Sequence, residues 1–318
     1  MHTRERNSSL WVLGHGGFYG SSLASEATAQ GYSVFPKALL PWGDFEARPL
    51  AFHSIAEEFA AFSHGTDTTI IWAAGAQGVA NSQTGFSPEL DSFHNFVDTL
   101  MSIPELHGAT VVIVSSAGGV YGGSPAPPFD SSSPARAINQ YGLNKIAIEE
   151  LALGRLAEHF HVQIARVTNL YGPWHGPRQG LINRLCTAAA TREALQIYVP
   201  LDTVRDYIYV TDAARLLLLE LETKSTAVDT RRSRVVLIGS GESSSVGSVI
   251  NTVANVTHRK VPVTMAQLME TDLQPRDLRM LPSWVDQGLD FAPLTLTQGI
   301  KRLFDALVTV PRWSETGK

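Results

Sequence analysis

A tyrosine and a lysine, Tyr141 and Lys145, stand four positions apart in the segment Tyr-Gly-Leu-Asn-Lys. On a helix this spacing places both side chains on one face, where they can meet around one reacting group. A free phenol has a pKa of about 10, and a neighbouring lysine cation favours its phenolate form. Such a tyrosine can exchange a proton with a substrate hydroxyl. The pair is the predicted catalytic centre, although an exposed helix face would show the same spacing.

Two serines offer a hydroxyl at the end of the β-rich run that precedes this pair. The run 111–114 leads into Ser115 and Ser116. A hydroxyl at that strand end can hydrogen-bond the reacting oxygen and hold it near the phenol of Tyr141. A polar loop that closes the strand is the alternative for either serine, so both are candidate catalytic residues.

A glycine-rich loop, Gly-His-Gly-Gly-Phe-Tyr-Gly at 14–20, follows the first apolar run of the chain. Glycine permits the tight turn and the close approach of the backbone to a pyrophosphate, while free N–H groups at the start of the next helix attract the anion. An ordinary tight turn is the alternative. In this position the loop predicts a nicotinamide dinucleotide site. Its predicted residues are Gly14, Gly17, Phe18, Tyr19 and Gly20.

The choice between NAD and NADP depends on the end of the second strand, where NAD-binding loops carry a carboxylate for the ribose 2′-hydroxyl. Phe-Pro-Lys-Ala occupies 35–38, without an acid. Lys37 could meet a 2′-phosphate instead, which would favour NADP, or it is a solvated surface lysine. The expected cofactor is therefore NAD or NADP.

The elements that must hold these residues alternate along the first two-thirds of the chain. Short β-rich runs are separated by longer amphipathic stretches, which is typical of βαβ units around a parallel sheet. The predicted strands are 10–13, 32–35, 69–72, 110–115, 162–167 and 235–238. The predicted helices are 21–30, 93–101, 181–190, 211–221 and 245–255. We therefore predict an α/β, doubly wound parallel-sheet Rossmann fold with a smaller C-terminal substrate-binding portion.

The expected division places a mainly dinucleotide-binding Rossmann domain at 1–168 and a mainly substrate-binding portion at 169–318. One or more segments at about 205–240 are expected to return to the Rossmann sheet. The stretches 124–134 and 223–234 are predicted surface loops, because they are rich in turn-forming and polar residues.

Composition excludes several classes of function. The 318 residues are 44% hydrophobic, enough for a sizeable core, and the net charge of -5 comes without a Lys/Arg run, so neither nucleic acid nor a membrane is an expected partner. Cys186 is the only cysteine, which excludes an internal disulfide and favours a cytoplasmic location. The histidines lack metal-binding spacing, so no metal is expected.

Ordered segments along nearly the whole chain resemble the motifs of the extended short-chain dehydrogenase/reductase superfamily, in particular its NAD-dependent epimerase/dehydratase members. These are the glycine loop, Trp-Ala-Ala-Gly at 72–75, the serine loop ending in Val-Tyr-Gly at 115–122, the Tyr141/Lys145 pair, Arg-x-x-Asn-x-Tyr-Gly-Pro at 166–173, Arg-Asp-Tyr-x-x-Val-x-Asp at 205–212 and Gly-x-Gly at 239–241.

The resemblance implies roles for further residues. Ala73, Ala74 and Gly75 would lie beside the adenosine, and both members of the catalytic pair would also contact the cofactor. Asn169 would touch a sugar nucleotide, and Arg205 would grip its diphosphate. The family's Arg-Pro-Gly-Asp segment is reduced to Gln-Pro-Arg-Asp at 274–277, so Arg276 and Arg279 are candidates for the missing arginine.

Two departures from the family pattern keep questions open. The position that usually holds the catalytic Ser or Thr is Ala117, one residue after Ser116. The usual position of the ribose-binding acid holds Ala38, so the resemblance does not decide between NAD and NADP.

The resulting expectation is an NAD(P)-dependent oxidoreductase or epimerase that transfers hydride at C4 of a nucleotide-linked sugar, with Tyr141 as acid and base. An NADPH-dependent 4-ketoreductase of a nucleotide deoxysugar is the alternative, since both chemistries use the same pair. A 4,6-dehydratase is disfavoured, because Gly118 and Gly119 supply no acid after Ala117. A non-catalytic dinucleotide-binding sensor is a second alternative, which the retained pair disfavours. The expected assembly is a homodimer.

Overall fold

The computed structural model describes residues 6–36, 39–75, 88–174, 176, 180–226, 233–265 and 274–309. Lys37 and Ala38, which carry the predicted choice between NAD and NADP, lie outside the described residues.

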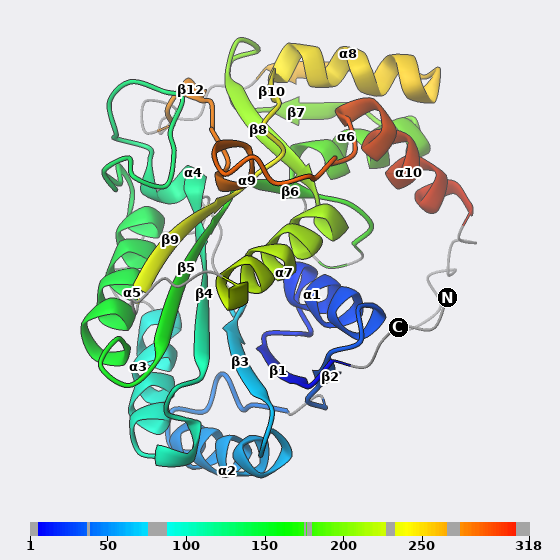
Figure 1. Cartoon of the computed structure of the whole chain (residues 1–318). Coiled ribbons are helices and arrows are strands. Elements are labelled where there is room, and N and C mark those ends of the chain that lie inside the picture. The colour runs from blue at the N-terminus through cyan, green and yellow to red at the C-terminus, as the bar shows by residue number, and fades with distance from the viewer. Residues whose placement is uncertain are drawn as a thin grey trace.

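A six-stranded parallel sheet forms the centre of the molecule (Figure 1). Its strand order is β2-β1-β3-β4-β5-β9. The strands are β1 (Ser8–Leu13), β2 (Ser33–Val34), β3 (Asp67–Trp72), β4 (Thr110–Ser116), β5 (His161–Val167) and β9 (Ser233–Ile238). Strands such as β4, with the sequence Thr-Val-Val-Ile-Val-Ser-Ser, are nearly continuous in β-branched residues because both faces of the sheet are covered.

Helices cover both faces of this sheet (Figure 1). On one face, α1 (Phe18–Ala29) packs against α7 (Val210–Thr226). On the other face lie α2 (Ala47–Phe62), α3 (Pro88–Met101) and α5 (Gln140–Leu156). Each layer buries its own apolar core against the strands. The predicted α/β, doubly wound fold is confirmed.

Two helices illustrate why these sequences form these elements. In α3 the apolar residues Phe93, Phe96, Val97 and Leu100 recur at intervals of three and four and are all buried against the sheet. At the start of α5 the Asn139 side chain accepts a hydrogen bond from the backbone N–H of Gly142 at 2.9 Å. This N-cap fixes the first turn of α5, which carries Tyr141.

The C-terminal residues form a smaller mixed sheet and a helical layer above the main sheet in Figure 1. In this sheet β8 (Val204–Tyr209) pairs with β6 (Asn169–Tyr171), β10 (Ser243–Ser245) and β12 (Asp277–Leu278). A separate parallel pair is formed by β7 (Leu195–Ile197) and β11 (Val263–Met265). Helices α6 (Leu181–Thr191), α8 (Val246–Thr257) and α10 (Leu296–Thr309) share a core with Tyr171 and Tyr209. The short helices are η1 (Pro104–Leu106), α4 (Ala117–Val120) and α9 (Ser283–Asp286).

The structure departs from the sequence-based elements in several places. Helices α2 and α10 and the strands of the smaller sheet were not predicted. The predicted surface loop at 223–234 is wrong at both ends, because α7 continues to Thr226 and β9 begins at Ser233. Strand β9 pairs with β5 in the main sheet, while the division at 168/169 stays a prediction. Among the described helices, none is both long enough and apolar enough to cross a membrane.

The strand order determines where a ligand can bind. The chain moves from β1 outward to β2 and then crosses to β3 on the other side of β1. In open α/β sheets ligands bind beyond the carboxyl ends of the strands at such a reversal. The glycine loop follows β1 and the Ala-Ala-Gly segment follows β3, so both lie at this point.

Candidate active site

The glycine loop is built for close backbone contacts that a side chain would prevent. Gly14 has a φ of +85°, and a β-carbon there would lie 2.6 Å from the backbone nitrogen of Ala74. A β-carbon on Gly20 would lie 2.2 Å from the carbonyl oxygen of Gly14, so α1 packs directly on the loop. Gly17 caps α1 without a side-chain hydrogen bond, and the first turn carries no acid. The helix start therefore suits a pyrophosphate.

A cavity of about 260 Å³, the glycine-loop cavity, adjoins this loop. Its lining residues are Gly14, Gly17, Trp42, Trp72, Ala73, Ala74, Gly75, Pro88, Glu89 and Ser92. The cavity thus brings together two of the loop glycines and the whole Ala-Ala-Gly segment. Its walls are largely apolar, because they include Trp42 and Trp72. The rings of these two residues lie edge to face with centroids 5.9 Å apart. The apolar walls and the helix start without a side-chain cap suit a dinucleotide.

Two predicted cofactor residues use their side chains elsewhere. Tyr19 is buried, and its hydroxyl donates to the carbonyl of Ala213 at 2.9 Å. The ring of Phe18 lies 5.6 Å from the ring of Trp174. Neither residue lines the glycine-loop cavity, and both belong to the first turn of α1.

The catalytic pair is held in the first turns of α5. The Nζ atom of Lys145 lies 5.8 Å from the centre of the Tyr141 ring. Helix α4 supports that ring closely, because a β-carbon on Gly119 would lie 2.9 Å from Cε1 of Tyr141. A β-carbon on Gly142 would lie 2.2 Å from the carbonyl oxygen of Gly119. Glycines on both helices therefore let α4 and α5 approach until the phenol is fixed.

Lys145 has an acidic partner that the sequence did not reveal. Its Nζ lies 2.5 Å from Oε1 of Glu89 in α3, and only 9% and 5% of the two side chains are exposed. Burial alone lowers the pKa of Lys145, but the charge of Glu89 and the neighbouring Tyr141 outweigh it, so the pKa stands above its ordinary value. Lys145 is thus a charged group inside the protein.

The two candidate serines have different surroundings. The hydroxyl of Ser115 donates to Oε1 of Glu149 at 2.5 Å, in a buried network with Arg166. Ser116 caps α4, accepting a hydrogen bond from the N–H of Gly119 at 3.3 Å. Ser116 also lines a second cavity, whereas Ser115 does not.

This second cavity, the Arg205 cavity, has a volume of about 150 Å³. Its lining residues are Ser116, Gly118, Asn139, Thr168, Asn169, Arg205, Gln274, Pro275 and Leu278. Asn169 donates from its amide to the carbonyl of Asp206 at 2.8 Å. Asn139 and Thr168 were not predicted as site residues, because a helix cap and a strand-end hydroxyl also occur in purely structural roles.

Arg205 is half-buried in this cavity, and desolvation lowers its pKa, although the neighbouring Tyr207 and Asp277 act in the opposite direction. Its Nη1 donates to the carbonyl of Val204 at 2.8 Å, and within the described part of the chain it forms no ion pair. A half-buried guanidinium that makes no ion pair among the described residues suits an anionic ligand, because it can donate two parallel hydrogen bonds to phosphate oxygens.

The two substitute arginines lie outside the Arg205 cavity. Arg276 pairs with Asp202 at 3.3 Å, and 72% of its side chain is exposed. Arg279 pairs with Asp277 at 2.9 Å. The backbone of Arg276, in contrast, contacts the strand that carries Arg205, because its carbonyl accepts a hydrogen bond from the N–H of Val204 in β8.

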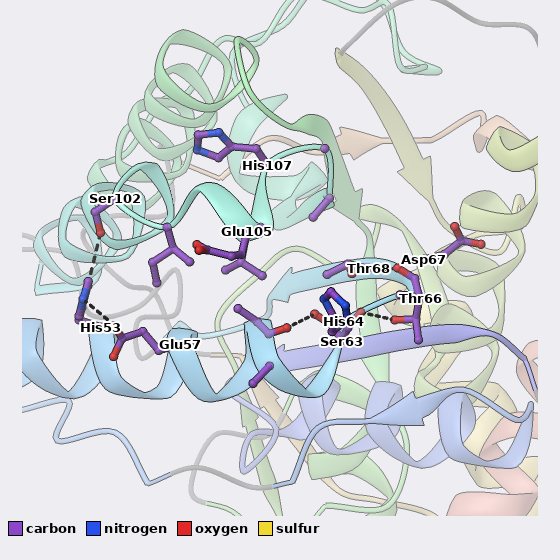
Figure 2. Close-up of a pocket in the computed structure, with 17 residues that line it drawn as sticks. His53, Glu57, Ser63, His64, Thr66, Asp67, Thr68, Ser102, Glu105 and His107 are labelled. Atoms are coloured by element: carbon purple, nitrogen blue, oxygen red, sulfur yellow. Dashed lines mark hydrogen bonds and ion pairs between the residues drawn. The ribbon is translucent and has the colours of Figure 1, made fainter.

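A third cavity, of about 900 Å³, lies at the opposite, amino-terminal ends of β3 and β4. Figure 2 shows His53 on α2 bridging Ser102 and Glu57 at this cavity. No predicted site residue lines it. The described residues also contain no group of histidines, cysteines and acids that could hold a metal ion. The predicted residues Gly14, Ser116 and Arg205 instead line the glycine-loop cavity and the Arg205 cavity.

Comparison with known proteins gives concordant results. The UDP-glucose 4-epimerase of Streptomyces lividans is 30% identical over 205 residues, which are 59% of this chain and 61% of that relative, less than two thirds of its length. The UDP-glucose 4-epimerase of Lacticaseibacillus casei is 26% identical over 284 residues, which are 80% of this chain and 83% of that relative.

Solved structures share the fold. The UDP-glucose 4-epimerase of Bifidobacterium longum, solved in complex with NAD+ and UDP, superposes with a TM-score of 0.75 at 18% identity, over 95% of this chain and 98% of that one. A family model described as the NAD dependent epimerase/dehydratase family matches residues 10–239, well over half of the sequence. As the motifs predicted, the chain belongs to the NAD dependent epimerase/dehydratase family.

Proposed function

We propose that this protein is an NAD-dependent 4-epimerase of a UDP-linked sugar. The observation that carries the proposal is the position of the Tyr141/Lys145 pair relative to the two cavities. Lys145 lies against Gly75 of the glycine-loop cavity, and Tyr141 lies against Gly119, next to Gly118 of the Arg205 cavity. A proton-transferring group thus stands between a dinucleotide site and an anion site.

NAD bound in the glycine-loop cavity would accept a hydride from C4 of the sugar and return it to the other face. Tyr141 takes the proton of the C4 hydroxyl in the first half of the reaction and gives it back in the second. The Lys145 ammonium supports this role, because a nearby positive charge favours the phenolate. The inversion therefore requires no other acid or base from the protein.

Ser116 is the proposed hydroxyl partner of the substrate, and Ser115 is a structural residue. The Ser116 oxygen accepts one hydrogen bond from the α4 backbone, which leaves its proton to donate toward the reacting oxygen. The proton of Ser115 is already committed to Glu149. The structural and the catalytic serine are therefore consecutive residues at the end of β4.

Arg205 is the proposed anchor of the substrate diphosphate, together with the Asn169 amide in the same cavity. The UDP-glucose 4-epimerase relatives support uridine diphosphate as the carrier. Arg276 and Arg279 are not part of the proposal, since both are exposed and paired with neighbouring aspartates.

Two alternatives use the same residues differently. A 4-ketoreductase would take hydride from external NADPH, and a non-catalytic sensor would bind the dinucleotide alone. The NAD-dependent family and the epimerase relatives favour NAD and epimerisation. A 4,6-dehydratase needs an acid near the sugar, and the Gly118-Gly119 turn supplies none. The homodimer and the cytoplasmic location stay predictions.

The direct test is to incubate the purified protein with NAD and either UDP-glucose or UDP-galactose and to follow inversion at C4 by proton NMR. We expect both starting sugars to reach one equilibrium mixture, with a heat-treated sample as control. Net oxidation of NADPH with a 4-keto nucleotide sugar, without inversion of either substrate, would establish the ketoreductase instead. Dinucleotide binding without turnover of any nucleotide sugar would establish the sensor.

A further inference from the structure

We propose that Glu89 is a positioning residue of the active site, whose carboxylate keeps the Lys145 ammonium charged and fixed beside Tyr141 at the wall of the glycine-loop cavity. Its catalytic consequence rests on the proposed function. The ion pair itself can be tested without substrate or cofactor.

The geometry places this ion pair at the junction of the site. Nζ of Lys145 and Oε1 of Glu89 are 2.5 Å apart and buried, although the residues come from α5 and α3. A β-carbon on Gly75 would lie 3.3 Å from Oε1 of Glu89 and 3.4 Å from Nζ of Lys145. Glu89 and Gly75 both line the glycine-loop cavity. The pair therefore forms part of the wall that a bound dinucleotide would face.

Two carboxylates act on Lys145, and Glu89 is the one that does not also form an ion pair with a second cation. The ionisable groups that act on Lys145 are Glu89 from α3 and Tyr141 and Glu149 from α5. Glu149 is itself neutralised, because it forms a buried ion pair with Arg166 at 2.7 Å. Among the described residues, Glu89 makes its ion pair with Lys145 alone. Removing its charge would leave a buried ammonium beside a phenol and an already neutralised carboxylate.

The mutual neutralisation of Glu89 and Lys145 favours both proton transfer at Tyr141 and binding of the dinucleotide. An isolated buried lysine loses its proton readily, and a neutral amine would no longer stabilise a phenolate at Tyr141. An isolated carboxylate in the cavity wall would repel the negatively charged pyrophosphate of a dinucleotide. Paired, the two groups present a fixed ammonium and little net charge.

The small number of lysines permits a direct measurement of the Lys145 charge. The sequence contains Lys37, Lys145, Lys224, Lys260, Lys301 and Lys318. Protein labelled with [ε-13C]lysine should therefore give few NMR signals, and Lys145→Arg identifies the one from Lys145. Each signal shifts as its amine loses a proton, so a pH series on the cofactor-free protein reports the midpoint for Lys145.

We expect Glu89→Gln, which keeps the shape but not the charge, to lower this midpoint by at least about one pH unit. Glu89→Asp keeps the charge and should give an intermediate midpoint. The matched control is Asp98→Asn, which removes an exposed carboxylate from the same helix α3 and its ion pair with Arg155. The control should leave the Lys145 midpoint at its wild-type value.

The same change should appear in catalysis as a loss of activity on the alkaline side, with a midpoint lowered by a similar amount in Glu89→Gln. Circular dichroism verifies folding, and Glu89→Asp provides the test if Glu89→Gln is unfolded. An unchanged Lys145 midpoint in folded Glu89→Gln would overturn the proposal. If Glu89→Gln is unfolded, an unchanged midpoint in Glu89→Asp would overturn it instead. Wild-type protein that inverts no UDP-sugar would contradict the proposed function and leave the NMR result standing.

Discussion

Gly119 and Tyr141 are in such close contact that the tyrosine ring occupies the place of a side chain on the neighbouring helix. A β-carbon on Gly119 would lie 2.9 Å from Cε1 and 3.1 Å from Cδ1 of Tyr141. Gly119→Ala must therefore displace the ring or move α4 away from α5. Because a shift of about 1 Å at a reacting group can cost about 100-fold, we expect turnover to fall by about that factor.

The measurement for Gly119→Ala is kcat for C4 inversion, with NAD affinity determined separately. Gly154→Ala is the matched control, because Gly154 is an exposed residue of α5 with nothing within 4 Å of its β-carbon position. The control should keep wild-type turnover. Equal turnover in both variants would show that the phenol does not depend on the α4–α5 contact.

Tyr141→Phe removes the phenolic oxygen and leaves the ring packed against Gly119. Proton transfer by a positioned group typically contributes about 100- to 10,000-fold to the rate, so turnover should fall within that range. NAD binding, followed by quenching of protein fluorescence, should change little. Activity within severalfold of wild type would remove Tyr141 from the mechanism.

The adjacent serines should separate stability from catalysis. Ser115→Ala removes a hydroxyl that donates to the buried Glu149 and should lower the free energy of unfolding by about 1–3 kcal/mol, with turnover of the folded protein retained. Ser116→Ala should lower turnover, and Ser116→Thr, which keeps a hydroxyl, should recover much of it. Chemical denaturation and kcat measure the two effects. Reversal of this pattern would make Ser115 the catalytic hydroxyl.

Much of this arrangement follows from local sequence. The glycine loop and the buried strands are predictable because each depends on residues within a few positions, such as the φ of Gly14 or the β-branched run in β4. Helix α2 escaped prediction because its apolar residues, including Phe52 and Phe59, stand among many alanines and show little amphipathic contrast.

Contacts between distant elements could not be predicted in the same way. The partner of Lys145 is Glu89, in a helix that reads as an ordinary amphipathic segment with acids in its first turn. The choice between Ser115 and Ser116 depends on Glu149, which lies one turn beyond Lys145. An acidic side chain on a helix is usually solvated, so the sequence alone favours the surface for both glutamates.

Arg205 provides the test of the substrate class. Arg205→Ala removes a half-buried guanidinium from the Arg205 cavity, and hydrogen bonds to a charged group contribute about 1.5–3 kcal/mol each. We therefore expect KM for a UDP-sugar to rise by about 10- to 150-fold, with NAD affinity unchanged, because the glycine-loop cavity does not include this residue. Steady-state kinetics and NAD titration measure the two quantities.

Arg276→Ala is the matched control for Arg205→Ala. Arg276 lies near the same strand, but its side chain is exposed and paired with Asp202. Its KM should stay within about twofold of wild type, because an exposed ion pair contributes about 1 kcal/mol at most and does not line the cavity. A large effect of Arg276→Ala with a silent Arg205→Ala would move the diphosphate to the exposed arginine. If both variants are silent and free sugars react as well as UDP-sugars, the substrate is not held by a diphosphate, and the protein is a Tyr141-dependent oxidoreductase of another substrate class.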